Sequence, residues 1–378
     1  MSVSGIIFAN LHDKYIPELT TTRTLASVPF ACRYRIIDFP LSCFANAGIS
    51  DVKVITQTNY HSLMDHLGSG KDWDLARRVG GLKLLPPFIT AYSSNQSQIY
   101  STRLNALKNI SMLINRSNDD YIVLADCDGI CNIDINDLVN SHIRSGADLT
   151  MAIKRVTLTP EKAKHSSIVV SSPDGELLDM IRDPKDLPEG EVDININIWV
   201  VTRSYLQRAV AESIVRDYDN FAKDVIIRNI GKHNFRVYRF DGYYAKITSL
   251  EDYFACSMNL LNEKSIRRAL FSVPSRPIVT KVRNSTPTEY LPGSSVVNSM
   301  IADGCVIEGH VENSIIFRGV KVGKGSVVKN SILFQDTQTG RGVNLNCVIT
   351  DKSVFIRDGV TLSGHPSIPF CIEKEKVL

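Results

Sequence analysis

The sequence contains no long hydrophobic run. Its first apolar stretch, Ile6 to Ala9, is far shorter than a signal-peptide core or the ~20 apolar residues that span a membrane. We therefore interpret this stretch as a buried first strand. No membrane association is expected, and the lack of a secretory signal predicts a cytoplasmic location.

The sequence also contains no C-x-x-C pair. Its eight cysteines are spread through apolar surroundings, and Cys127 and Cys131 form the only close pair. Because no second ligand pair with zinc spacing follows them, a metal site at this pair is not expected. Reduced thiols, as in cytoplasmic proteins, are the favoured interpretation.

Charge of one sign is not concentrated anywhere in the chain. The 43 Lys and Arg residues nearly balance the 40 Asp and Glu residues, which gives a formal net charge of +3. Scattered basic residues do not favour binding to nucleic acid or to a membrane. Small anions remain candidate ligands.

The chain is long enough for more than one hydrophobic core, because 378 residues indicate about two domains. Hydrophobic residues make up 43% and charged residues 22%, as in ordinary globular proteins. In the first part, apolar runs alternate with amphipathic ones, and strands such as Val52 to Thr56 and Tyr121 to Ala125 are almost continuously apolar. Such strands are buried on both faces by helices, so an α/β sheet of doubly wound type is expected.

The second part of the chain has a different pattern. A helical pattern begins near Ser249, and four prolines between positions 274 and 292 mark a linker. From Val296 onward, short Val/Ile pairs recur with Gly between them, which favours a parallel β-helix over the alternative of a β-sandwich. The repeat slips between Gln335 and Val343, which predicts an imperfect solenoid or a loop there. The predicted domains are residues 1–250, a helical segment and linker at 251–290, and a β-helix at 291–378.

Three segments carry a resemblance to a known family. Residues 28–57 read VPFACRYRIIDFPLSCFANAGISDVKVITQ, residues 219–226 read DNFAKDVI, and residues 242–261 read GYYAKITSLEDYFACSMNLL. These segments closely resemble motifs of the ADP-glucose pyrophosphorylases (glucose-1-phosphate adenylyltransferases), and the first is highly specific. The resemblance spans essentially the whole chain. It implies a Rossmann-like nucleotidyltransferase domain (GT-A-like), followed by a left-handed parallel β-helix of imperfect hexapeptide repeats.

The resemblance also implies a reaction, in which ATP and glucose 1-phosphate give ADP-glucose and pyrophosphate with Mg²⁺. Catalytic members hold the triphosphate with a G-G-x-G-x-R-L loop and a following Lys. In that loop, Gly lets backbone N–H groups wrap the anion and Arg neutralises it. Counting back without gaps from Pro29 and Phe30, the required residues are replaced by Asn10, Leu11, Asp13, Tyr15 and Leu25. The alternative is that Lys14 and Arg23 compensate from nearby positions.

The resemblance places one metal-binding carboxylate at Asp128, with Asp126 as a nearby alternative. The second metal carboxylate of the family is replaced by Lys246. An ammonium cannot coordinate Mg²⁺ and repels it. We hypothesise that Lys246 pairs with Asp128 in place of the metal charge; the alternative is that Lys246 points into solvent.

The sugar-phosphate lysine of the family is replaced by Asp183, whose charge has the same sign as the phosphate. Arg182 could be a displaced cation, but strand alternation predicts that it points the other way. Lys223 matches a family lysine; either it retains a sugar-phosphate contact or it pairs with a neighbouring carboxylate. Of the base-contacting segment, only Thr102 remains.

Charges of the required sign are lost in three parts of the site. We therefore expect that this chain has no catalytic residues and no metal or cofactor site of its own. Such a chain resembles the GlgD-type regulatory subunits of the family, which implies a heterotetramer with a catalytic GlgC-type partner in glycogen biosynthesis. Arg33, Arg35 and Asp38 either line an effector or interface site or pair within the fold. The remaining alternatives are a divergent active nucleotidyltransferase and a stand-alone metabolite sensor.

Overall fold

The computed structural model describes residues 2–87, 100–185 and 190–378. The chain divides into two compact units that do not follow chain order. The first unit comprises Met1–His12, Phe39–Lys246 and Ser275–Pro277, and the second comprises Asp13–Asp38, Ile247–Pro274 and Ile278–Leu378. No helix among the described residues has the length and apolar character needed to cross a membrane.

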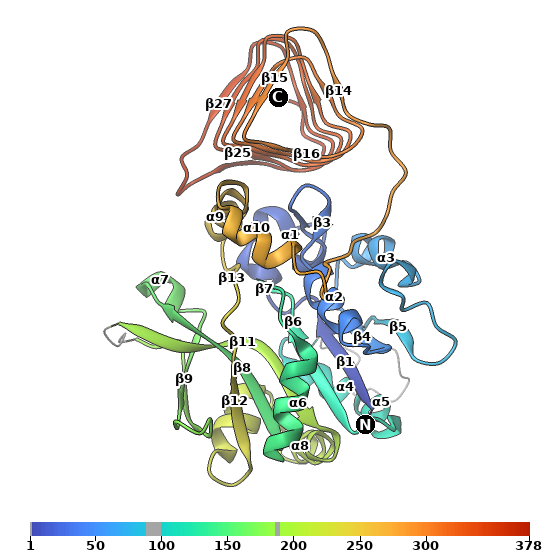
Figure 1. Ribbon diagram of the computed structural model, residues 1–378, viewed down its shortest axis with the longest axis vertical. Helices are drawn as coiled ribbons and strands as arrows, with labels where there is room; N and C mark the ends of the chain where they lie inside the picture. The colour runs from blue at the N-terminus through green and yellow to red at the C-terminus, as the bar shows by residue number, and fades with distance from the viewer. Residues whose placement is uncertain (1, 88–99, 186–189) are drawn as a thin grey trace. The chain divides into compact units, whose positions relative to one another are not determined.

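The described residues of the first unit form a nine-stranded sheet, with its central strands in the order β11-β6-β1-β4-β5 (Figure 1). Strands β6, β1, β4 and β5 run parallel, whereas β11 is antiparallel to β6. The strands are β1 (Val3–Phe8), β4 (Asp51–Ile55), β5 (Gly81–Leu85), β6 (Tyr121–Asp126), β8 (Leu149–Thr157), β9 (Ser167–Ser171), β10 (Leu177–Arg182), β11 (Glu191–Thr202) and β12 (Phe235–Arg239).

Helices cover both faces of this sheet. On one face, Ile6 and Phe8 of β1 belong to a buried cluster with residues of α4 (Arg103–Asn109), α5 (Ser111–Arg116) and α8 (Arg203–Val215). On the other face, Gly5 leaves room for the ring of Phe44 on α2 (Asp38–Asn46), because a Cβ at Gly5 would lie 2.4 Å from that ring. The doubly wound α/β fold expected from the continuously apolar strands is therefore confirmed.

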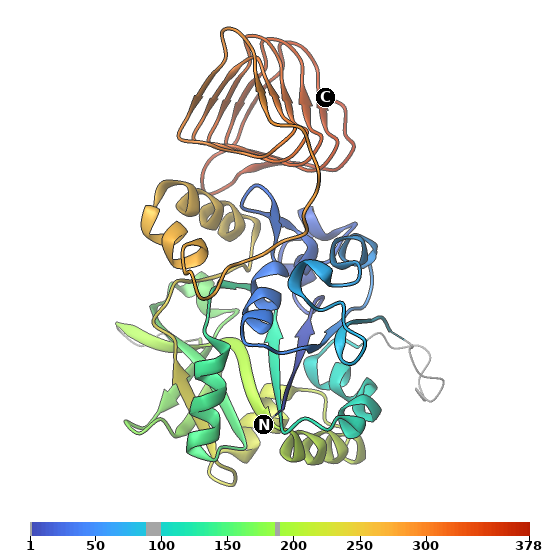
Figure 2. The same cartoon turned by 45° about the vertical axis from the view of Figure 1, so that its right-hand side comes forward.

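The second unit contains the β-helix, whose coils stack as a triangular prism (Figures 1 and 2). Its three faces are parallel sheets of five short strands each. One face has β14 (Glu289–Tyr290), β17 (Val306–Ile307), β20 (Lys321–Val322), β23 (Gln338–Thr339) and β26 (Phe355–Ile356). The second has β15 (Ser295–Val297), β18 (His310–Glu312), β21 (Val327–Lys329), β24 (Asn344–Asn346) and β27 (Thr361–Ser363). The third has β16 (Met300–Ile301), β19 (Ile315–Ile316), β22 (Ile332–Leu333), β25 (Val348–Thr350) and β28 (Phe370–Ile372).

The expected irregularity at Gln335 to Val343 was wrong. Gln338 pairs in register with Lys321 on one side and Phe355 on the other, so the coil continues without a loop. The aliphatic pattern fails there because threonines fill the inward positions: Thr337 and Thr339 are buried, and Thr337 hydrogen-bonds Thr350. An irregular turn occurs instead before β28, where His365 and Ile368 form an antiparallel bridge.

Two helices and the segment 13–38 complete the second unit. Helix α9 (Leu250–Asn262) is capped at its N-terminus by Ser249, whose side chain accepts a hydrogen bond from the backbone N–H of Asp252, and α10 (Lys264–Phe271) follows directly. Tyr253 of α9 donates a hydrogen bond to the carbonyl of Pro29 (2.6 Å) and packs edge-on against Phe334 of the β-helix. These contacts attach α9 and the segment 13–38 to the β-helix.

An asparagine ladder supports one corner of the β-helix. The amide of Asn313 donates to Asn330 (2.6 Å), and that of Asn330 donates to Asn346 (2.9 Å). Asn298, Asn313 and Asn330 have left-handed backbones, with φ between 40° and 48°. Asparagine tolerates this conformation better than other non-glycine residues and also satisfies its neighbours in the adjacent coils.

We predict that Asn330→Ala lowers the free energy of unfolding by about 2 kcal/mol, because it loses two amide hydrogen bonds and keeps an unfavourable φ. Asn330→Gly loses the same bonds without the backbone cost, so its loss should be smaller. Urea unfolding followed by circular dichroism measures both. Wild-type stability of the alanine variant would show that the ladder is dispensable.

Candidate functional site

The candidate site lies at the carboxyl ends of two adjacent parallel strands of the first unit. Phe8 at the end of β1 is in register with Asp126 at the end of β6. The chain after β1 supplies His12, and the turn between β6 and β7 (Gly129–Cys131) supplies Asp128. Ligands of open α/β sheets bind at this edge, so the three side chains occupy the position expected for a nucleotide site.

Asp126 is buried and is held by two partners. Arg103 Nε lies 2.9 Å from Oδ1 of Asp126, and the guanidinium also contacts Oδ2, which gives a bidentate pair. His12 Nε2 lies 2.6 Å from the same Oδ2. Arg103 is the first residue of α4 and lies 5.1 Å from the ring centroid of Trp199. Two protein side chains, Arg103 and His12, therefore already contact this carboxylate.

These partners determine the charge of Asp126. Burial alone would raise the pKa of its carboxyl group, but Arg103 and His12 outweigh burial and lower the pKa to about 2. A depressed carboxyl pKa contributes stability above the unfolded-state value of ~4. That contribution is lost as the pH falls from about 4 toward 2, so Asp126 is an anion at neutral pH.

Asp128 is paired with the lysine that replaces the second metal carboxylate. Lys246 Nζ lies 3.6 Å from Asp128 Oδ2, within ion-pairing distance, so the predicted pairing is confirmed. Strand β13 (Tyr244–Lys246) pairs with β7 and places Lys246 opposite Gly129, next to Asp128. Asn197 donates a hydrogen bond of 3.0 Å to the same carboxylate oxygen. The alternative, a lysine directed only into solvent, is wrong.

The side chains of His12, Asp126 and Asp128 come close enough together to hold a metal ion, since their ligand atoms lie within 4.8 Å of one another. Oδ1 of Asp128 is buried and has no hydrogen-bond donor among the described residues. However, Mg²⁺ prefers oxygen ligands and retains several waters. Here one ligand is an imidazole, and Arg103 and Lys246 already neutralise both carboxylates. The cluster therefore does not fit the Mg²⁺ that the family implies.

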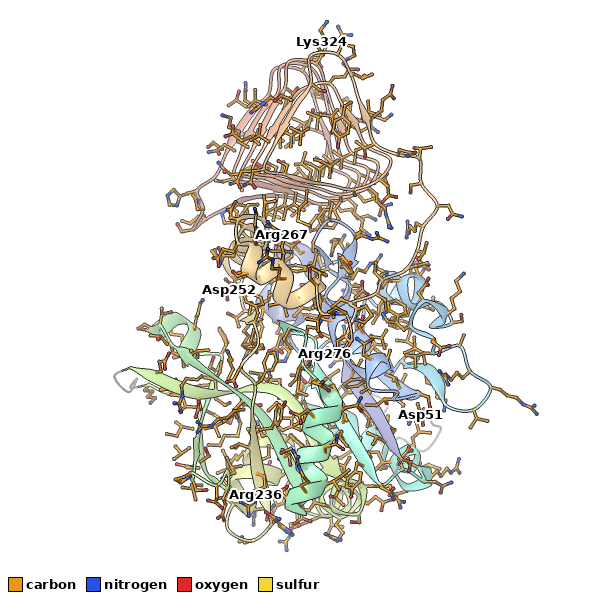
Figure 3. The ribbon with its side chains drawn as sticks, in the orientation of Figure 1. Asp51, Arg236, Asp252, Arg267, Arg276 and Lys324 are labelled. Atoms are coloured by element: carbon orange, nitrogen blue, oxygen red, sulfur yellow. The ribbon has the colours of Figure 1, made fainter. Side chains whose placement is uncertain are left out.

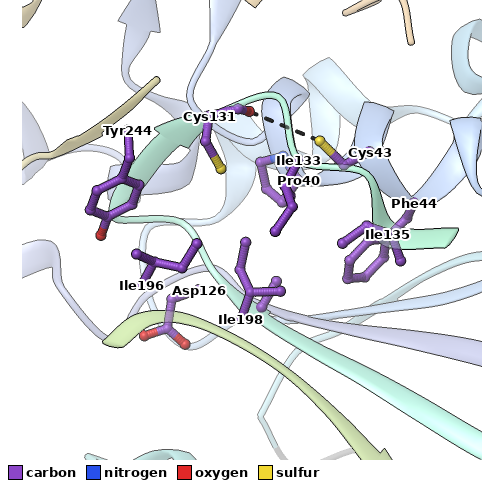
Figure 4. A pocket seen from close by; sticks show the side chains of 12 residues that line it. Pro40, Cys43, Phe44, Asp126, Cys131, Ile133, Ile135, Ile196, Ile198 and Tyr244 are labelled. Atoms are coloured by element: carbon purple, nitrogen blue, oxygen red, sulfur yellow. Dashed lines mark hydrogen bonds between the residues drawn. The ribbon is translucent and has the colours of Figure 1, made fainter. Parts of the chain in front are cut away.

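Asp126 also helps to line a narrow, mostly apolar pocket (Figure 4). Its lining includes Cys43, Ile196 and Ile198, and its volume is about 10 Å³, near the minimum for one water. Burial raises the pKa of Cys43 to about 12, so this thiol is not a reactive thiolate. The pocket cannot accommodate a nucleotide or a sugar phosphate.

The residues that replace the phosphate loop have structural contacts. Asn10 is buried and is hydrogen-bonded to residues 56–58. Its Oδ1 accepts hydrogen bonds from Thr56 Oγ1 (2.5 Å) and Gln57 N (2.9 Å), and its Nδ2 donates to Thr58 O. Leu11 packs against the main core cluster of the first unit. The side chains of Asn10 and Leu11 therefore hold this turn against neighbouring parts of the first unit.

Other replaced positions contact one another within the second unit. Asp13 Oδ1 accepts a hydrogen bond from the backbone N–H of Leu25 (2.7 Å), and Tyr15 ends the short helical turn Asp13–Tyr15. The suggested compensation by Arg23 does not occur, because its guanidinium is buried and lies 2.8 Å from Asp351 of the β-helix. Lys14 is exposed.

The sugar-phosphate positions are also occupied by other contacts. Asp183 follows the end of β10 with φ of 44°, and its carboxylate lies 3.8 Å from the guanidinium of Arg182. The expectation that Arg182 points away was wrong, since strand alternation ends at this left-handed residue. Lys223 is exposed and has no ion pair among the described residues, so its predicted carboxylate pairing is not found. Thr102 acts as the N-cap of α4.

Sequence reasoning missed two members of the site. His12 occupies a variable position of the family loop, and Arg103 lies in a segment whose match is weak. A usable signal for His12 was its position just after β1, because that strand pairs with the strand that ends in Asp126. Arg103 had no comparable signal, since its approach depends on where α4 packs.

We predict that Lys246→Met destabilises the chain by about 3 kcal/mol, because it leaves Asp128 buried without its cation. The double variant Asp128→Asn/Lys246→Met should lose clearly less than the sum of the two single losses. Urea unfolding of all four proteins measures the coupling. Lys223→Met is the control and should unfold like wild type, whereas additive losses would contradict the pairing.

Comparisons with known proteins agree with this fold. The family described as Nucleotidyl transferase matches residues 15–262, and the GlmU-like, C-terminal hexapeptide family matches residues 287–366. The chain is 32% identical over 370 residues to the glycogen biosynthesis protein GlgD of Bacillus subtilis (strain 168), covering 98% of this chain and 95% of that protein.

Two further relatives are a second GlgD protein and a glucose-1-phosphate adenylyltransferase. GlgD of Geobacillus stearothermophilus is 38% identical over 327 residues, or 86% of this chain and 82% of that protein. The glucose-1-phosphate adenylyltransferase of Thermotoga maritima is 31% identical over 333 residues, or 86% of this chain and 76% of that protein. The chain therefore belongs to the nucleotidyl transferase family, among the glucose-1-phosphate adenylyltransferases and the GlgD glycogen biosynthesis proteins.

Proposed function

We propose that this chain is a non-catalytic regulatory subunit of ADP-glucose pyrophosphorylase in glycogen biosynthesis. The observation that carries the proposal is the internal neutralisation of Asp126 by Arg103 and of Asp128 by Lys246. In a working site these carboxylates would be available to a metal. Here two fixed cations occupy them, and the similarity to GlgD proteins supports a role in the same process.

The magnitude of the losses favours an inactive chain. Removal of one preorganised charge-stabilising donor commonly lowers the rate by ~10² to 10³. This chain lacks the glycine loop, its Arg and Lys, one metal carboxylate and the sugar-phosphate lysine. Even when such effects are strongly non-additive, an ordinary turnover is not expected.

The proposed action is through a catalytic GlgC-type partner in a heterotetramer. Association would stabilise the active conformation of the partner, with a coupling of ~1 to 3 kcal/mol, or roughly 5- to 150-fold in affinity. A cytoplasmic location is part of the proposal; all eight cysteines are free thiols, as a reducing compartment would keep them.

Three parallel assays of ADP-glucose formation test the proposal: this chain alone, its catalytic partner alone, and the mixture. We expect no product from this chain alone, and a several-fold change in kcat or in the KM for glucose 1-phosphate in the mixture. The two chains should also co-elute in size-exclusion chromatography.

The Lys246→Met variant serves as a control for catalysis in the mixture. If this chain contributes no chemistry, the folded variant should stimulate the partner as wild type does. Product from this chain alone would support the divergent transferase instead. Unchanged partner kinetics without co-elution would overturn the regulatory role.

A further inference from the structure

One edge of the β-helix repeats the same short turn in three successive coils. The turn joins β20 to β21, β23 to β24 and β26 to β27. Residues 323–325 read GKG, residues 340–342 read GRG, and residues 357–359 read RDG. Figure 3 shows Lys324 at an outer corner of the β-helix. Four exposed cations lie along this edge, which we call the basic edge: Lys321, Lys324, Arg341 and Arg357.

Backbone hydrogen bonds stack these turns in register. The N–H of Gly342 donates to the carbonyl of Lys324 (3.0 Å), and the N–H of Gly359 donates to the carbonyl of Arg341 (2.8 Å). Glycine is needed for this close stacking, because a Cβ at position 323 would lie 2.1 Å from the carbonyl oxygen of Gly340. Neighbouring strands lie about 4.8 Å apart, so the backbones that carry Lys324 and Arg341 are held about one strand spacing from each other.

The cations of the basic edge have no ion-pair partner among the described residues. Asp358 lies at the same edge, but its Oδ1 accepts a hydrogen bond from the backbone N–H of Arg341 (2.8 Å) and the carboxylate pairs with no arginine side chain. On the adjacent face, by contrast, Lys329 Nζ lies 2.8 Å from Glu312 Oε2. Like charges fixed one coil apart repel each other, and an external anion would relieve this repulsion.

Exposed apolar side chains adjoin the basic edge and indicate which kind of anion fits. Phe355 of β26 precedes Arg357 by two residues and is 43% exposed, and it forms a bridge with Val377, which is 54% exposed. Arginine and aromatic side chains together are typical of protein interfaces. Polyphosphate would leave the ring of Phe355 unused, and a single ring offers no platform on which successive bases of a nucleic acid could stack.

We propose that the basic edge binds an acidic segment of a partner protein, in which apolar residues follow the carboxylates. Every second side chain of an extended segment points the same way at intervals of about 7 Å, and three coils span about 10 Å. Two such carboxylates therefore reach Lys324 and Arg341 together, and the apolar residues pack against Phe355. Binding requires only this chain, so the inference is independent of the proposed regulatory function.

Fluorescence anisotropy of the full chain tests the inference with a fluorescein-labelled peptide of six glutamates followed by Leu-Phe-Leu. We expect saturable binding at low ionic strength that weakens about tenfold between roughly 50 and roughly 300 mM NaCl, because salt screens exposed charges. The same peptide with six glutamines should not bind measurably. Equal binding of the glutamine peptide, or displacement by polyphosphate or oligothymidylate at lower concentration than by unlabelled peptide, would overturn the proposed ligand class.

Variants of the basic edge locate the binding. Lys324→Gln and Arg341→Gln should each weaken peptide binding about threefold, and the double variant about tenfold, because each change removes one exposed ion pair. Phe355→Ser should also weaken binding of the peptide. Lys164→Gln, which changes an exposed lysine of the first unit, should bind like wild type. Circular dichroism verifies that the variants are folded. Unchanged affinity in the double variant, or no binding by wild type, would overturn the proposal.

Discussion

Two carboxylates buried at the end of one strand constrain the first unit of this protein. Asp126 and Asp128 are at most 5% exposed, and unpaired charges at such depth would cost several kcal/mol each. Arg103 and Lys246 supply the compensating charges from α4 and from β13. Because both cations are covalently part of the chain, no ion or substrate is needed to stabilise this edge of the sheet.

The chain shares the fold of its family but lacks the residues that carry out the family's chemistry. The sheet places the site where a nucleotide site would lie, and the β-helix keeps its regular coils. The turn after β1 is closed by Asn10, and Arg23 is bound to Asp351. The parts that specify the fold are retained, while the parts that would handle phosphate and metal have acquired structural partners.

Much of the fold could be predicted from the sequence, because it depends on local patterns. The apolar strands predicted the doubly wound sheet, and the recurring Val/Ile pairs predicted the β-helix. The coil at 335–343 was missed because Thr337 and Thr339 fill inward positions that the pattern reserves for aliphatic residues. The pattern reports which positions are apolar and cannot show that a hydrogen-bonded threonine fits the same position.

Contacts in the site could be predicted only at positions where this chain replaces a family residue whose role is known. Lys246 stands where a metal carboxylate is expected, so its pairing with Asp128 followed from charge alone. His12 and Arg103 reach Asp126 through the arrangement of β1 and α4, which no residue spacing encodes. Pairings that depend on how distant elements pack require the three-dimensional structure.

The most direct test of internal neutralisation is the binding of Mn²⁺ to the chain, measured from the electron paramagnetic resonance signal of the free ion. Fixed cations at both carboxylates predict that the signal of added Mn²⁺ stays undiminished up to millimolar concentrations. Binding of one Mn²⁺ per chain at micromolar concentration, abolished by Asp128→Asn, would contradict the account.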